Sequence, residues 1–240
     1  MAKYLDQDGL AHLVEKNDER YVRKEEGKGL STNDFSDEYK KIVDDLNYTK
    51  IAINSMTVTN SNNEIGATVT DTDVAWTLNK TPKTQKIKFS SEAEESLGTD
   101  ARSKSYTGKS VQSNSIIKLT VTDERDAEVS RQVTIQFQPK VYYGVSADPN
   151  ALDSEMINAL TGALASSRAR TFSANAGTGE YIVYIIPSSF GTPTFNVGGF
   201  DGGFKKAKTI EHTNASGYKQ NYDIWQSVNA ALGQTSVTVK

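Results

Sequence analysis

The sequence predicts a mostly β protein with short N-terminal helices, in which an immunoglobulin-like β-sandwich is followed by a β-rich α+β C-terminal domain. The first 48 residues are highly charged: they hold eight Lys or Arg and twelve Asp or Glu, whereas the remaining 192 hold nineteen and eighteen. Apolar residues recur at helical spacing in this leader and at every second position beyond it. We therefore expect a helical leader at 1–48, a sandwich at 49–138 and a β-rich C-terminal domain with one helix at 139–240.

The composition excludes several kinds of chemistry. The 240 residues include no Cys and only two His, which removes thiol nucleophiles, disulfides and thiolate metal sites. A net charge of -3 gives no electrostatic reason to expect nucleic acid as a partner. The sequence also lacks an apolar run of membrane-spanning length and a secretory signal. We expect no cofactor, no metal, no nucleic-acid or membrane partner, and synthesis in a cytoplasm without export by the usual route.

The leader has the pattern of two short helices separated by a glycine-containing hinge. Asp6 or Asp8 is expected to begin the first helix, and Ser36 to cap the second. The first helix has three apolar residues on one face, namely Leu10, Leu13 and Val14. The second has a stripe at i, i+3, i+4 and i+7, namely Tyr39, Ile42, Val43 and Leu46. Helices of about ten residues are unstable alone in water. The second stripe therefore either joins copies of the chain or packs on the sandwich.

Alternation of apolar and polar residues predicts the strands of the middle domain at 74–78, 87–89, 117–121 and 133–137. Turn-rich links separate these runs, including 60–63 and 123–126. Six or seven short strands with an early buried Trp76 predict an immunoglobulin-like sandwich. Because the chain has no cysteine pair, packing alone must hold the two sheets together.

In the C-terminal domain, Asp153 is the expected N-cap of a helix with four inward residues: Met156, Ile157, Leu160 and Leu164. Strands are expected at 181–186, 193–197, 208–213, 221–226 and 236–239. The glycine-rich segment 198–204 is interpreted as a tight turn anchored by Phe200 and Phe204 rather than a nucleotide site, because no Gly-Lys-Ser/Thr ending follows it.

Residues 18–22 (DERYV) and 27–35 (GKGLSTNDF) resemble the leader of bacteriophage fibre and baseplate proteins. In that family such a segment, followed by a short helix, connects the virion-anchoring end to the outward domains. Two further sets of segments are similar to domains of phage appendage proteins. The first combines 68–79 with 119–125, and the second combines 142–145, 195–200 and 227–239.

The resemblance implies a non-enzymatic virion structural protein, part of a head fibre or of a tail or baseplate fibre. It implies a homotrimer that docks on capsid or tail proteins and displays outward domains, with a host-surface glycan as a further candidate partner. It carries no catalytic residue. The chain lacks a long coiled coil or collagen-like shaft, which favours a compact decoration or connector. The residues expected to serve docking or oligomerisation are Leu10, Leu13, Val14, Tyr21, Leu30, Phe35, Tyr39, Ile42, Val43 and Leu46.

A carbohydrate-binding or carbohydrate-degrading tail appendage is the alternative. Four residues near the end of the chain carry aromatic or acidic side chains suited to sugar contact: Tyr218, Tyr222, Asp223 and Trp225. Against this interpretation, a tryptophan in a strand is ordinarily buried. A glycosidase needs two converging carboxylates, and the spacing of Asp201, Glu211 and Asp223 does not bring any two together. We therefore expect a protein that is not an enzyme.

Overall fold

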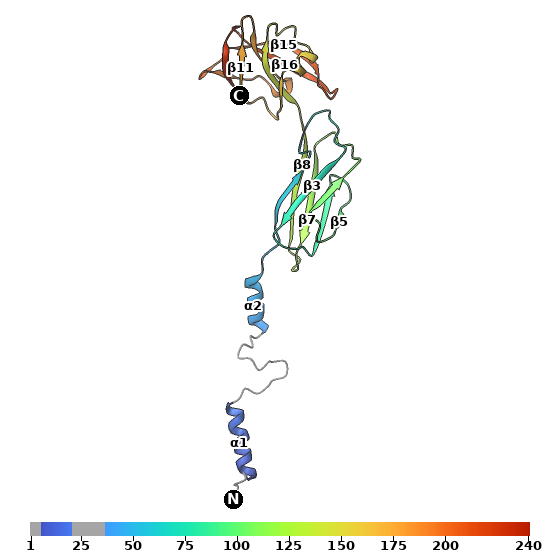
Figure 1. Cartoon of the computed structure of the whole chain (residues 1–240), viewed down its shortest axis with the longest axis vertical. Helices are drawn as coiled ribbons and strands as arrows, with labels where there is room; N and C mark the ends of the chain where they lie inside the picture. Colours follow the sequence, from blue (N-terminus) through green and yellow to red (C-terminus); the bar gives the residue numbers. More distant parts are fainter. Residues whose placement is uncertain (1–5, 21–36) are drawn as a thin grey trace. The chain divides into compact units, whose positions relative to one another are not determined.

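The computed structural model describes residues 6–20 and 37–240, with side chains as far as Asn17 in the first stretch. The chain divides into two compact units, Met1–Lys50 and Ile51–Lys240, which can be followed by colour in Figure 1. Strands dominate and helices are few, which confirms the predicted mostly β class. Tyr21, Leu30, Phe35, the expected cap Ser36 and the segment 27–35 lie outside the described residues.

The first unit contains two helices, α1 (Gln7–Arg20) and α2 (Asp37–Asn47). Asp6 begins α1, because its carboxylate oxygen accepts a hydrogen bond from the Gly9 N–H at 2.8 Å. This is the earlier of the two predicted starts. The first turn of α2 carries Asp37 and Glu38, whose charges are favourable beside the free N–H groups of a helix start.

The second unit begins with two packed sheets. One contains β1 (Ile53–Val58), β3 (Thr72–Leu78) and β6 (Ser103–Tyr106), in the order β1-β3-β6. The other has the order β2-β8-β7-β4-β5 and contains β2 (Asn62–Glu64), β4 (Thr84–Phe89), β5 (Glu95–Leu97), β7 (Ser115–Thr122) and β8 (Glu128–Gln138). All pairs are antiparallel except β2 with β8. The predicted alternating runs correspond to β3, β4, β7 and β8, while the immunoglobulin-like assignment stays an interpretation of this strand order.

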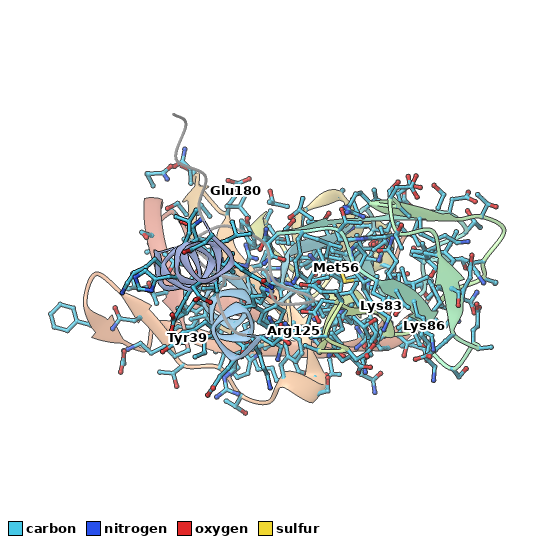
Figure 2. The ribbon with its side chains drawn as sticks, turned by 90° about the horizontal axis from the view of Figure 1, so that it is seen from below. Tyr39, Met56, Lys83, Lys86, Arg125 and Glu180 are labelled. Atoms are coloured by element: carbon cyan, nitrogen blue, oxygen red, sulfur yellow. The ribbon has the colours of Figure 1, made fainter. Side chains whose placement is uncertain are left out.

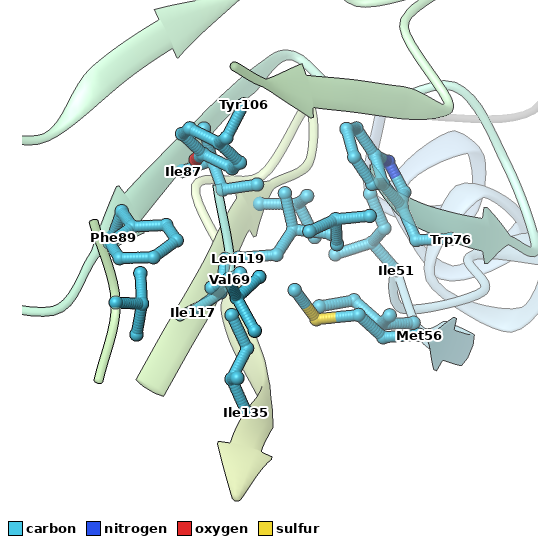
Figure 3. Packing of buried hydrophobic residues seen from close by; sticks show 14 residues of the cluster. Ile51, Met56, Val69, Trp76, Ile87, Phe89, Tyr106, Ile117, Leu119 and Ile135 are labelled. Carbon is cyan, nitrogen blue, oxygen red and sulfur yellow. The ribbon is translucent and has the colours of Figure 1, made fainter. Parts of the chain in front are cut away.

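The two sheets enclose one apolar core, shown in Figure 3. Trp76 on β3 is 2% exposed, as predicted, and its indole N–H donates to Gln85 Oε1 on β4 at 3.3 Å. This hydrogen bond joins the two sheets through a buried side chain. Leu119 on β7 is fully buried and comes from the opposite sheet. Apolar packing and a buried hydrogen bond thus hold the two sheets together without a disulfide.

Asp123, in the turn between β7 and β8, is a second buried polar side chain of the sandwich. Its side chain is fully buried, and its carboxylate oxygens accept from the N–H groups of Ile51, Arg125 and Ala127 at 3.0–3.1 Å. Lys80 Nζ lies 3.4 Å away. A buried carboxylate is tolerated only with such partners. Asp123 therefore fixes the turn between β7 and β8 and also the chain entering β1.

The C-terminal domain has a five-stranded antiparallel sheet with the order β10-β9-β12-β16-β15. Its strands are β9 (Lys140–Ser146), β10 (Thr161–Leu164), β12 (Tyr181–Pro187), β15 (Phe204–Thr213) and β16 (Lys219–Ser227). A four-stranded sheet, β11-β17-β13-β14, covers one face and contains β11 (Arg170–Ala176), β13 (Phe195–Val197), β14 (Phe200–Asp201) and β17 (Gly233–Val239). Helix α3 (Ser154–Ala159) belongs to the apolar cluster on the other face. Because both faces of β12 are covered, its sequence is a continuous apolar run.

Several expectations for this domain were wrong in detail. Asp153 caps α3 and Ile157 is fully buried, as predicted. Met156, however, is 51% exposed, and Leu164 lies in β10 because the helix is only six residues long. In the glycine-rich segment, Phe204 stacks on Phe195 at 4.1 Å between ring centroids, as an anchor should. Phe200 is 81% exposed and anchors nothing.

Candidate functional site

The apolar residues predicted for docking are exposed on both helices of the first unit. On α1, Leu10, Leu13 and Val14 are about half exposed. On α2 the four stripe residues are exposed to between 42% and 80%: Tyr39, which is labelled in Figure 2, with Ile42, Val43 and Leu46. No α2 side chain is buried. Each helix therefore has an apolar face that, in the single chain, remains in contact with water.

A polar junction joins the sandwich to the C-terminal domain within the second unit. The Lys140 ammonium forms an ion pair with the mostly buried Glu64 carboxylate at 2.8 Å. The Asn214 side-chain amide donates to the Ile65 carbonyl at 2.7 Å, and the Ile65 N–H donates to the Gln138 carbonyl at 2.9 Å. Chain segments far apart in sequence are thus tied together where β8 leads into β9.

His212 lies next to this junction and is completely buried. Its Nε2 is 3.3 Å from the Tyr142 hydroxyl, which in turn lies 3.5 Å from a Glu64 oxygen. Its Nδ1 is buried with no hydrogen-bond partner among the described residues. Burial lowers the pKa of His212, although the Glu64 charge opposes this. Burial, with Glu64 beside it, also raises the pKa of Tyr142.

A hollow of about 410 Å³ opens beside the junction, lined by Ile65, Gly66, Gln112, Ser216, Gly217 and Tyr218. Gly66 has φ +91°, and a Cβ there would lie 2.5 Å from the Tyr218 Cβ. The close approach of Tyr218 to the chain therefore requires glycine at this position. Tyr218 itself is 40% exposed. The lining carries one aromatic ring, one amide and one hydroxyl side chain, and no charge.

The four residues predicted to contact glycan do not come together. Tyr218 lines the hollow, but Tyr222 is 1% exposed, and its hydroxyl donates to the Lys140 carbonyl at 2.9 Å. Burial raises the pKa of Tyr222 to about 12. Trp225 packs against the inter-sheet core, 5.8 Å from Phe195 between ring centroids. Tyr222 therefore cannot stack on a sugar, and Trp225 is partly buried against the core.

Asp223 is also engaged within the fold. Its Oδ1 accepts hydrogen bonds from Ser188 at 2.7 Å and Thr209 at 2.8 Å, and Lys206 Nζ lies 2.8 Å away. Burial by itself would raise the pKa of Asp223, but the bonds from Lys206, Ser188 and Thr209 outweigh it and lower the pKa. These contacts hold the Asp223 carboxylate within the fold, so its role is to stabilise β15 and β16 rather than to bind a ligand.

The junction was not anticipated from the sequence. Its signal is the run Asn214-Ala215-Ser216-Gly217, which has turn composition. The Asn214 side-chain oxygen accepts from the N–H groups of Ser216 and Tyr218, which closes the turn between β15 and β16. The role of Asn214 toward Ile65, 149 residues away, depends on tertiary structure.

Within residues 6–20 and 37–240, no helix is long and apolar enough to cross a membrane. The same part of the chain contains no group of three or more His, Asp or Glu side chains arranged to hold a metal ion.

The chain has little detectable similarity to known proteins. No family model and no curated protein matches the chain. A solved structure from Bacteroides ovatus, the mixed-linkage glucan utilization locus protein SGBP-B in complex with a mixed-linkage heptasaccharide, is 15% identical with a TM-score of 0.25. The match covers 80% of this chain and 44% of that one, so the chain spans less than half of its length. A TM-score of this size does not establish a common fold.

The buried His212 predicts acid sensitivity. Histidine in an unfolded chain has a pKa of about 6.5, and the folded value is lower. The stabilisation is therefore complete above pH 6.5 and is lost as the pH falls below it, because the unfolded chain takes up the proton first. This one group contributes at most about 1.4 kcal/mol per pH unit to the slope of the free energy of unfolding against pH.

The test is chemical denaturation at several pH values between 7.5 and 5. The free energy of unfolding of His212→Gln should fall less steeply with decreasing pH than that of the wild type. An unchanged slope in His212→Gln would contradict this assignment.

Proposed function

We propose that the chain is a non-enzymatic structural component of a bacteriophage virion, a multimeric fibre or decoration protein of the head or tail. The N-terminal helices attach the protein to the particle, and the two β-domains are displayed outward. The observation that carries the proposal is the exposed apolar face on both helices of a unit separate from the β-domains. The resemblance of residues 27–35 to a phage connector segment supports it.

Self-association through α2 is the first part of this proposal. The stripe at Tyr39, Ile42, Val43 and Leu46 has the spacing of the apolar positions of a coiled coil. It spans little more than one heptad, so it is too short to hold a lone helix pair firmly. Three copies packing these faces together would remove them from water, at about 25 cal/mol for each Å² of apolar surface buried. We propose a homotrimer, which is also the usual state of such fibres.

Attachment to the virion is the second part. The α1 face at Leu10, Leu13 and Val14 is distinct from the α2 stripe and is equally exposed. Tyr21, Leu30 and Phe35 lie between the two helices in sequence and provide further apolar side chains. A capsid, tail or baseplate protein is the proposed partner of this region. Repeated copies on one particle would replace strong single contacts by avidity.

The proposed trimer leads to a test of α2. Light scattering of the full-length chain at micromolar concentration should give about three times the mass of the 26.2 kDa chain. Replacing Ile42 and Leu46 by Asn should shift it to monomer while leaving the β-domains folded. Lys41→Gln changes an exposed polar residue of the same helix and should not affect the mass. A stable wild-type monomer would refute the trimer.

Attachment is tested separately by removing residues 1–48. The remaining chain keeps the compact unit Ile51–Lys240 with all of its cores, so it should fold. We expect circular dichroism to show an intact β-protein and immunoblots of purified phage particles to lack it. Particles that still carry the truncated protein would show that the leader is not the anchor.

Glycan binding at the host surface is a second candidate function, favoured by the hollow at the junction. A tyrosine ring beside amide and hydroxyl groups, without charge, suits a neutral sugar. A glycan array should show binding that Tyr218→Ala abolishes. Tyr181→Ala, at a half-buried tyrosine outside the hollow, is the matched control. If wild type and Tyr218→Ala give the same array pattern, the hollow is not the glycan site.

A further inference from the structure

The outer face of the five-stranded sheet of the sandwich concentrates lysines. Along β4 the side chains of Ile87 and Phe89 are buried in the core, so the alternate residues Lys86 and Lys88 face outward. Lys118 on β7 faces the same way, since its neighbours Ile117 and Leu119 are buried. We call Lys86, Lys88 and Lys118 the lysine face. Lys86 and Lys118 are exposed, and Lys88 is half-buried.

Two of these lysines stand directly opposite each other. Lys88 and Lys118 are register partners in the antiparallel pair of β4 and β7. The Cβ atoms of such partners are about 4.5–5.5 Å apart, and like charges at this spacing destabilise a sheet. Neither Lys88 nor Lys118 forms an ion pair with any acidic side chain of the described residues. The nearest carboxylate to Lys86 belongs to Glu94, at 3.9 Å.

Four other lysines of the sandwich differ from these, because each has a close acidic partner. The distances are 2.8 Å for Lys80 with Glu124, 2.6 Å for Lys83 with Asp126, 2.5 Å for Lys104 with Glu95 and 2.6 Å for Lys109 with Glu92. Lys83 and Lys86 are both labelled in Figure 2. These four lysines of the sandwich are thus paired with acids, whereas Lys88 and Lys118 form a like-charged pair on this one face. Charge complementarity points to an anionic partner.

The remaining residues of the face indicate what kind of anion fits. The register of β4, β7 and β8 places neutral hydrogen-bonding side chains beside the lysines: Thr84, Thr120, Thr122, Ser130, Gln132 and Thr134. One apolar side chain, that of Ile116, is also exposed on this face, opposite Thr134. Glu128 lies at the margin, opposite Thr122. These positions include no aromatic ring for stacking. The three ammonium groups can pair with negative charges, and the hydroxyl and amide groups around them can hydrogen-bond to hydroxyls. A polymer that carries both negative charges and hydroxyls would therefore fit this face.

We infer that the lysine face binds an anionic polysaccharide. The ammonium groups of Lys88 and Lys118 contact its charged groups, and the Thr, Ser and Gln side chains hydrogen-bond to its hydroxyls. Binding relieves the repulsion within the lysine pair, so it also stabilises the sandwich. This site is separate from the hollow at Tyr218, and it does not depend on a virion location.

Alginate, a linear polyuronate, is a suitable probe, with neutral dextran and polyphosphate for comparison. Full-length protein should bind alginate in biolayer interferometry at 20 mM NaCl, at least tenfold more weakly at 300 mM NaCl, and should not bind dextran. Alginate should also raise the melting temperature. Polyphosphate binding as tight as alginate binding would overturn the inference, because polyphosphate has charges but no hydroxyls.

The double variant Lys88→Gln/Lys118→Gln should bind alginate at least tenfold more weakly. Lys118→Gln alone should raise the melting temperature without ligand, since it removes the repulsive pair. The double variant Lys83→Gln/Lys104→Gln makes the same change in net charge at paired lysines of the same domain, and should bind alginate as the wild type does. Equal losses in the two double variants, or no alginate binding by the wild type at 20 mM NaCl, would overturn the inference.

Discussion

Apolar packing between sheets is the constraint on which both β-domains depend, because the chain has no cysteine to join them covalently. In the sandwich, Trp76 and Leu119 enter the same core from opposite sheets, and a fully buried side chain of this kind contributes about 1.5–3 kcal/mol. The buried polar side chains of this domain, Thr72, Gln85 and Asp123, each form hydrogen bonds. Stability without covalent links therefore requires that few buried polar groups be left unpaired.

The elements predicted correctly from the sequence are those in which one physical rule dominates. Strands β3, β4 and β7 bury one face, so large apolar residues alternate with polar ones, and β12 buries both faces, so its apolar run is continuous. Strand β11 was missed because its core-facing residues are Phe172 and two alanines, which give a weak alternating signal. The helix at Asp153 was extended too far because Leu160 continues the helical spacing while its backbone is already extended.

The candidate functional residues also divide into those whose exposure could be predicted from the sequence and those whose exposure could not. Exposure of the α2 stripe could be predicted, because a short helix with one apolar face has nothing nearby in sequence to cover it. The glycan residues could not, because consecutive residues of a strand point to opposite faces: Tyr222 enters the cluster under α3, and Trp225 enters the core between the sheets. Tyr218, in the turn before the strand, is the most exposed of the four, and Trp225 is partly buried. The junction at Glu64, Lys140 and Asn214 depends on pairings between distant segments.

The proposed assembly and the inferred polysaccharide site support each other through multivalency. A few exposed ammonium groups bind an anion weakly, since ion pairs at the surface contribute about 0–1 kcal/mol each. A single lysine face would therefore hold a polymer only briefly. If three copies associate through α2, three such faces meet the same polymer, and each later contact forms at the high effective concentration created by the first. In the proposed trimer, the weak contacts of three lysine faces would therefore add up along one polymer.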